Sequence, residues 1–198
     1  MGADAVHRPI VLAFAGPNGS GKSTVKRGLP PFGVYINADD LKSEYGLTDL
    51  EAAQQAEALR NELLNRKVDF SFETVLSTER NLALLHRAKE AGYEIQCIYV
   101  LTSNADVNVA RVRARVAVGG HDVPEDKIRS RYHRALALLP KLISVCDKIL
   151  IYDNTEAPAL IFKKENTWSE LFPNALWPYE KLNALLGTYS IFPKRVTM

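Results

Sequence analysis

The amino-acid sequence predicts an α/β fold in which a mostly parallel sheet is flanked by helices. Two observations carry this prediction. Short apolar runs alternate with helical segments along the chain, and a glycine-rich loop of the phosphate-binding type joins the first apolar run to a helix. The length of 198 residues suits a single domain, for which we expect a core over about residues 9–155 and an extension over about 156–198.

Six apolar runs are candidates for strands. Short, almost wholly apolar runs are typical of strands that are covered on both faces of a sheet. The run at 93–101 is the strongest of them. The candidate strands are residues 9–15, 33–37, 69–73, 93–101, 148–152 and 159–162.

Helices are expected between these runs. Thr48 and Glu51 have the spacing of a capping box, as do Ser103 and Asp106, and Pro124 suits the first turn of a helix. The expected helices are residues 22–29, about 48–67, 78–91, about 103–118 and about 124–139, with one more near 179–186 in an otherwise irregular tail.

Composition and charge bound the classes of partner. The formal net charge is +2, which gives no reason to expect a nucleic acid or a membrane as a partner. Cys97 and Cys146 lie in or beside apolar runs, so we expect two buried, reduced thiols. The N-terminus lacks the apolar core of a signal peptide, and no stretch approaches the roughly 20 apolar residues of a membrane span. We therefore expect a cytoplasmic protein.

The glycine-rich loop fits the pattern G-x-x-x-x-G-K-[ST] and lies between an expected strand and an expected helix, which is the context that the pattern requires. Its glycines let backbone N–H groups point at phosphate oxygens. Lys22 would neutralise the β- and γ-phosphates, Ser23 would offer its hydroxyl to Mg²⁺, and the helix N-terminus favours the same anion. The sequence therefore predicts a site for ATP with Mg²⁺, formed by Gly16, Pro17, Asn18, Gly19, Ser20, Gly21, Lys22, Ser23 and Thr24.

Other motifs narrow the class of phosphate-loop protein. The chain has no Asn-Lys-x-Asp motif for reading guanine, which argues against a GTPase. Asp153 ends an apolar run, but Asn154 follows it where a hydrolase of the ABC type would carry a glutamate. A small-molecule kinase needs only a base for the acceptor hydroxyl and cations around the moving phosphoryl group.

Carboxylates follow two of the expected strands, at the sheet edge where ligands bind in open α/β folds. Asp39 or Asp40 could accept a hydroxyl proton, and the alternative is that they cap a helix. Glu73 and Thr74 could bind substrate hydroxyls or support Mg²⁺. The alternative for them is a strand-end cap through Thr74 or Ser77.

Arginines gather around Gly119-Gly120. Arg111 and Arg115 are four residues apart and share a helix face, and Arg131 and Arg134 share a face of the next helix. Two such helices joined by glycines suit a lid that closes over phosphates, although a solvated basic surface is the alternative. His121 is expected to serve this turn or lid, because no second ligand has metal-binding spacing with it.

Together these motifs resemble the zeta-toxin family of phosphate-loop kinases, in particular its compact bacterial branch. The resemblance covers about residues 10–154. It rests on the phosphate loop, Ile36-Asn37-Ala38-Asp39, Phe72-Glu73-Thr74, Arg115-Val116-Ala117-x-Gly119-Gly120-His121-x-Val123-Pro124, Arg131-Tyr132-x-Arg134 and Tyr152-Asp153-Asn154.

The resemblance implies ATP-dependent phosphorylation of a UDP-sugar such as UDP-N-acetylglucosamine, and a small antitoxin protein as a partner. It also implies Asp39 as the catalytic base, Glu73 as a substrate-binding carboxylate with Thr74 beside it, and Arg115 with Arg131 or Arg134 as phosphoryl contacts. Two other readings stay open. One is a kinase for another small hydroxyl compound or a weak ATPase, and the other is an ATP-switched module that binds protein or RNA.

Overall fold

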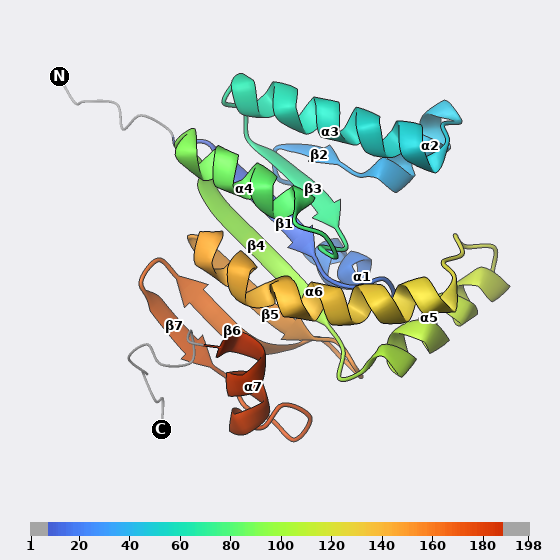
Figure 1. The fold of residues 1–198 in the computed structure, drawn as a ribbon, viewed down its shortest axis with the longest axis vertical. Helices are drawn as coiled ribbons and strands as arrows, with labels where there is room; N and C mark the ends of the chain where they lie inside the picture. Colours follow the sequence, from blue (N-terminus) through green and yellow to red (C-terminus); the bar gives the residue numbers. More distant parts are fainter. Residues whose placement is uncertain (1–7, 188–198) are drawn as a thin grey trace.

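The computed structural model describes residues 8–187, which form one seven-stranded sheet with helices on both of its faces (Figure 1). The strands are β1 (Ile10–Ala15), β2 (Val34–Ile36), β3 (Phe70–Thr74), β4 (Glu94–Leu101), β5 (Lys148–Asp153), β6 (Ala159–Glu165) and β7 (Trp168–Leu171). The helices are α1 (Lys22–Arg27), α2 (Ala38–Tyr45), α3 (Asp49–Asn65), α4 (Arg80–Glu90), α5 (Ala105–Ala117), α6 (Glu125–Val145) and α7 (Tyr179–Leu186).

The sheet order is β2-β3-β1-β4-β5-β6-β7. The first five strands of this order are parallel, and β6 and β7 add antiparallel strands at one edge. The predicted α/β fold with a mostly parallel sheet is therefore confirmed. Because β1 lies between β3 and β4, the loop after β1 emerges at the centre of the carboxyl edge, where the neighbouring strands also end.

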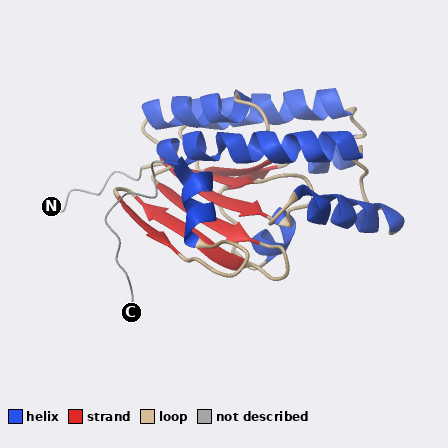
Figure 2. Ribbon diagram, turned by 60° about the horizontal axis from the view of Figure 1, so that its bottom comes forward, coloured by secondary structure: helices blue, strands red, loops and turns tan. Residues whose placement is uncertain are grey.

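The helices are distributed unequally over the two faces of the sheet. In Figure 2 the long helices form a layer on one face, and the main core contains buried side chains of α3, α4, α6 and α7 packed on the strands. The short α1 covers part of the other face, where Val25 packs against Phe14, Ile98 and Val100. The pair α5 and α6 extends past the carboxyl ends of the strands (Figure 1), and this places it above the loop that follows β1.

Several element boundaries differ from the sequence predictions. Helix α5 is capped by Asn104, whose side chain accepts hydrogen bonds from the N–H groups of Asp106 and Val107, so the predicted cap at Ser103 is wrong. Helix α6 continues past Leu139 to Val145 and contains Pro140. The capping box of Thr48 and Glu51 is confirmed at the start of α3.

The C-terminal tail is more regular than expected. Helix α7 has the predicted bounds, but β7 was not predicted and pairs with β6, which extends to Glu165. Residues 188–198 of the predicted extension lie outside the described residues. Helix α2 was not predicted as a separate element either.

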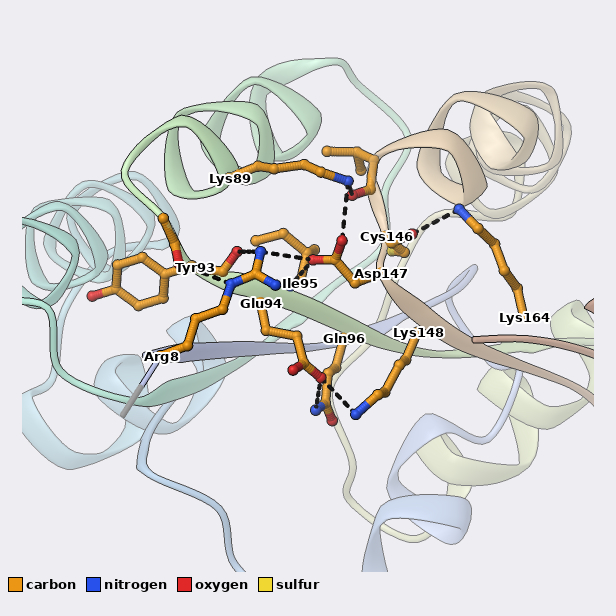
Figure 3. A network of polar contacts seen from close by, with 12 residues as sticks. Arg8, Lys89, Tyr93, Glu94, Ile95, Gln96, Cys146, Asp147, Lys148 and Lys164 are labelled. Atoms are coloured by element: carbon orange, nitrogen blue, oxygen red, sulfur yellow. Dashed lines mark hydrogen bonds and ion pairs between the residues drawn. The ribbon is translucent and has the colours of Figure 1, made fainter. Parts of the chain in front are cut away.

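The amino edge of the sheet is held by polar contacts far from the phosphate loop (Figure 3). The carboxylate of Asp147 accepts a hydrogen bond from the backbone N–H of Ile95 at 2.8 Å. It also pairs with Lys89 at 3.3 Å and with Arg8 at 3.5 Å. These contacts join α4, β4 and the segment before β5, and they are not part of any motif that the sequence analysis identified.

Two further expectations concern the cysteines and the membrane. Cys97 and Cys146 are both free and buried, as predicted, and burial raises the pKa of the Cys97 thiol. Over residues 8–187, no helix combines the length and the apolar character required to cross a membrane.

Candidate active site

The phosphate loop runs from the end of β1 into α1. The backbone N–H of Gly16 donates to the carbonyl of Thr74 at 3.2 Å, which attaches the loop to the end of β3. A turn follows, in which the N–H of Ser20 donates to the carbonyl of Pro17 at 3.2 Å. Gly21 adopts φ 88° at the start of α1, a conformation that glycine accepts without strain. The loop therefore has the strand-to-helix context that an anion site requires.

Neighbouring groups approach the glycines too closely for a side chain. A Cβ at Gly16 would lie 2.0 Å from the carbonyl oxygen of Val100, and one at Gly21 would lie 2.1 Å from Nδ2 of Asn154. Glycine is therefore required at these two positions by packing as well as by backbone conformation.

Lys22 is a buried cation at the start of α1. Its Nζ donates to the carbonyls of Gly16 at 2.9 Å and Pro17 at 3.3 Å. Burial lowers the pKa of Lys22; the nearby carboxylates of Glu73 and Asp39 oppose this shift, and Arg115 adds to it. A phosphate bound at the loop would add strong negative charge beside Lys22 and so favour its ammonium form.

Glu73 lies on the same side of the sheet as Lys22. Its Oε1 is 3.9 Å from Nζ of Lys22, and its Oε2 accepts a hydrogen bond from the hydroxyl of Tyr35 at 3.0 Å. Lys26 places its Nζ 3.2 Å from the centroid of the Tyr35 ring. Burial first, and then Glu73, raise the pKa of Tyr35, so this hydroxyl stays protonated and remains a donor. Sequence reasoning missed Tyr35, because nothing local marks its alignment with Glu73.

Asp39 and Thr74 occupy different surroundings. The side chain of Asn37 caps α2 by accepting from the N–H of Asp39 at 3.1 Å, so the carboxylate of Asp39 is not needed as the cap. The Thr74 hydroxyl accepts from the N–H of Leu76 at 2.9 Å and from Asn81 at 2.7 Å. This is the strand-end cap that was the alternative to substrate binding at Thr74.

A cavity of about 480 Å³ opens beside the phosphate loop. Its lining joins the loop to Glu73, to two arginines of α5 and to the segment after β5. The lining residues are Gly19, Gly21, Lys22, Ser23, Thr24, Glu73, Arg111, Val112, Arg115, Asn154, Glu156, Ala157 and Pro158. Because this cavity joins the phosphate loop to charged groups of β3 and α5, we take it as the candidate active site.

Helix α5 faces the loop with two arginines. Arg111 donates to the carbonyl of Thr155 at 3.0 Å and approaches that of Ser20 at 3.5 Å. Arg115 lines the cavity and also donates to the carbonyl of His121, while the side chain of His121 is exposed. The shared face of Arg111 and Arg115 is thus confirmed, and the turn at His121 is tied back to α5.

Helix α6 separates the two arginines that sequence analysis could not distinguish. Nη1 of Arg131 lies 3.4 Å from Oδ1 of Asn18 in the phosphate loop. Arg134 is exposed, and it has no polar partner among residues 8–187. Arg129 instead joins the two helices through Asp106 of α5 at 2.7 Å, and it also pairs with Glu125 of its own helix at 2.8 Å.

Potential ligands for a metal ion are few. Between residues 8 and 187, no three His, Cys, Asp or Glu side chains form a cluster that could hold a metal. Ser23 and Glu73 nevertheless line one cavity. Mg²⁺ characteristically takes only one or two protein groups and completes its shell with water and substrate phosphates, so this donor set fits Mg²⁺ bound together with a nucleotide.

Comparison with known proteins adds to this geometry. The model of the Zeta toxin family matches residues 3–166. An uncharacterized protein of Haemophilus influenzae is 30% identical over 127 residues, which are 61% of this chain and 91% of that protein.

Two solved structures share the fold. One belongs to the PezAT toxin-antitoxin system of Streptococcus pneumoniae, with a TM-score of 0.55, 20% identity, and coverage of 79% of this chain and 72% of the other. The other is AvrRxo1-ORF1:-ORF2 with ATP, with a TM-score of 0.64, 14% identity, and coverage of 80% and 59%. Because the family model spans most of the sequence and the sheet has the matching architecture, the chain belongs to the Zeta toxin family and has the fold of a phosphate-loop kinase.

Proposed function

We propose that this protein is an ATP-dependent kinase that transfers the γ-phosphate to a hydroxyl of a UDP-sugar such as UDP-N-acetylglucosamine. One observation carries the proposal: Lys22 of the phosphate loop lies near the carboxylates of Glu73 and Asp39, and it lines one cavity with the two arginines of α5. A phosphoryl donor and a hydroxyl acceptor can meet there between a base and compensating cations.

The donor would lie along the cavity. Its phosphates occupy the loop from Gly16 to Thr24, and its nucleoside extends toward residues 156–158, which also line the cavity. Ser23, with Glu73 beside it, would hold Mg²⁺, which neutralises phosphate charge when it is bound. The ammonium of Lys22 would also contact phosphate oxygens.

The acceptor hydroxyl approaches from the side of α2. Its oxygen forms a bond to the γ-phosphorus as the bond to the bridging oxygen of ADP breaks, and its proton passes to Asp39. Arg115 and Arg131 stabilise the charge on the transferring group. Glu73, held by Tyr35, binds acceptor hydroxyls, with Thr74 and His121 at the margin of this site.

A second part of the proposal concerns a protein partner. The structural neighbour from Streptococcus pneumoniae belongs to a toxin-antitoxin system, and we include a small antitoxin protein as a proposed partner of this chain. Co-purification of the tagged protein with the product of a neighbouring small gene would test this point independently of catalysis.

The decisive experiment incubates the purified protein with Mg-ATP and a panel of UDP-sugars, followed by mass spectrometry. One added phosphate on a UDP-sugar, absent with Asp39→Asn, supports the proposal. Phosphorylation of a different hydroxyl compound would support the kinase activity but contradict the proposed UDP-sugar acceptor. ADP production without any phosphorylated acceptor would identify a weak ATPase, and ATP binding without turnover would favour a nucleotide-switched binding module.

A further inference from the structure

The carbonyl oxygens of the phosphate loop each need a partner that turns them away from the bound anion. Backbone N–H groups can point at phosphate only where the carbonyls of the same peptides point elsewhere. Lys22 contacts the carbonyls of Gly16 and Pro17, and the carbonyl of Gly21 accepts from Thr24 at 3.0 Å. The carbonyls of Asn18 and Ser20 accept hydrogen bonds from side chains outside the loop.

Asn108 of α5 holds the first of these two carbonyls. Its Nδ2 donates to the Asn18 oxygen at 2.6 Å, and its side chain is fully buried. The hydroxyl of Thr102 donates to Oδ1 of Asn108, which fixes the amide so that its nitrogen faces the loop.

Asn154 holds the second carbonyl from the end of β5. Its Nδ2 donates to the Ser20 oxygen at 2.8 Å, and the residue is 4% exposed. Its backbone N–H donates to the carbonyl of Leu101 at 2.8 Å, which anchors the residue to β4. Arg111 approaches the Ser20 oxygen at 3.5 Å from a different direction.

The glycines of the loop make room for these two contacts. A Cβ at Gly19 would lie 2.5 Å from the carbonyl oxygen of Asn108, and a Cβ at Gly21 would lie 2.1 Å from Nδ2 of Asn154. Gly19 and Gly21 therefore lie directly under the two asparagines. At these two glycines, which have no side chains, the loop backbone contacts α5 and the segment at the end of β5.

We propose that Asn108 and Asn154 are positioning residues that hold the phosphate loop with its N–H groups directed at the triphosphate. They act through the Asn18 and Ser20 carbonyls and do not themselves touch the nucleotide phosphates. The inference rests on the nucleotide-binding part of the proposed function and is independent of the acceptor.

The test replaces each donor with an apolar side chain of similar volume, in Asn108→Leu and Asn154→Leu. Loss of one buried hydrogen bond, with an acceptor left unpaired, corresponds to an increase in the Kd for Mg-ATP of about tenfold or more. Adenosine has no phosphate, so its Kd should change by less than about twofold. Both constants are measured by titration calorimetry at a temperature where circular dichroism shows each variant to be folded.

A matched control removes a partly buried asparagine far from the loop. Asn183 lies on α7, so Asn183→Leu should leave the Kd values of both ligands as they are in the wild type. If a leucine variant does not fold, Asn108→Ser and Asn154→Ser replace it, since a hydroxyl is too short to reach the carbonyl and the same selective loss is expected.

The outcomes separate this inference from the proposed function. Wild-type ATP affinity in the folded variants would overturn the inference, and so would equal losses for ATP and adenosine, which indicate general damage to the cavity. The readout is nucleotide affinity, so a protein that phosphorylates no UDP-sugar refutes the acceptor alone and still permits this test. A wild-type protein that binds no Mg-ATP would overturn both.

Discussion

The protonation of Lys22 depends on its burial and on three charged neighbours. Burial lowers the pKa of Lys22, Glu73 and then Asp39 raise it, and Arg115 lowers it further. ATP binding needs the ammonium form, so the free protein must take up a proton on binding once the pH exceeds this lowered pKa. Affinity for ATP therefore decreases as the pH rises through the pKa of Lys22 in the free protein.

We expect removal of the Glu73 charge to shift this decrease to lower pH. In Glu73→Gln the largest of the effects that raise the pKa of Lys22 is lost, so the ammonium deprotonates earlier. The measurement is the Kd for Mg-ATP from pH 7 to pH 10. Glu156→Gln is the control, because Glu156 lines the same cavity but does not shift the pKa of Lys22. Coincident pH profiles for Glu73→Gln and the wild type would contradict this account.

Asp39 can be tested without disturbing the helix that carries it. Because Asn37 caps α2, Asp39→Asn should leave the melting temperature and ATP affinity near their wild-type values. An amide cannot accept the hydroxyl proton, so phosphoryl transfer should decrease by about 10²–10⁴-fold. Asp40→Asn should have a milder effect. The checks are a thermal melt with and without Mg-ATP and a steady-state transfer assay; a large loss in Asp40→Asn alone would move the base by one residue.

At the scale of elements, α5 and α6 behave as a joined pair above the phosphate loop. Arg113 pairs with Glu125, and Arg129 pairs with both Glu125 and Asp106. The turn between the helices is tied through the contact from Arg115 to the His121 carbonyl. Arg113 and Arg129 therefore serve to join the two helices, and fewer arginines remain to contact phosphates.

Arg115→Ala and Arg131→Ala should slow phosphoryl transfer more than they weaken ATP binding. Cationic stabilisation is stronger in the transition state than in the ground state, so the loss appears mainly in kcat. Arg134→Ala is the comparison on the same helix, because Arg134 is exposed and should have near-normal kcat. Steady-state kinetics with ATP Kd values check the prediction, and unchanged kcat in all three variants would leave only a surface-charge role.

Helix boundaries show which local signals are reliable. Thr48 and Glu51 predicted the start of α3 because a capping box is a contact between residues three apart. The helix that begins near Pro124 was expected to end at about residue 139, yet α6 continues through Pro140 because the turns on either side of it bury Leu139, Leu142 and Ile143 in the core. Tertiary packing there outweighs the local cost of proline.

At the scale of the whole molecule, stability and function are separated between the two edges of the sheet. The candidate active site lies at the carboxyl edge, whereas Asp147 joins Ile95, Lys89 and Arg8 at the amino edge (Figure 3). Substitutions at Asp147 should therefore change the free energy of unfolding without changing the chemistry.

Asp147→Ala should lower the free energy of unfolding by about 1–3 kcal/mol, since the Ile95 N–H and two cations lose their partner. The Mg-ATP Kd and kcat of the folded fraction should stay at wild-type values. Asp147→Asn keeps an oxygen acceptor for the N–H and should lose less stability. Urea denaturation and assays below the melting transition check both expectations; an altered ATP affinity would show that the two edges are coupled.

The sequence by itself determined the α/β class, the phosphate loop and the apolar strands, because each is encoded by neighbouring residues. The candidate carboxylates and arginines were also visible, as residues that follow strands or share a helix face. What only the tertiary structure decided is which of them meet. Tyr35 reaches Glu73 across 38 residues, and Arg131 reaches Asn18 across 113.

The two asparagines that hold the loop lie 90 and 134 residues from the carbonyls they contact. No periodicity or motif spacing in the sequence marks such pairs, because their proximity follows from the order of the strands in the sheet. β1 lies between β3 and β4, with β5 next, and this order brings the ends of these strands and the helix after β4 around one glycine-rich loop.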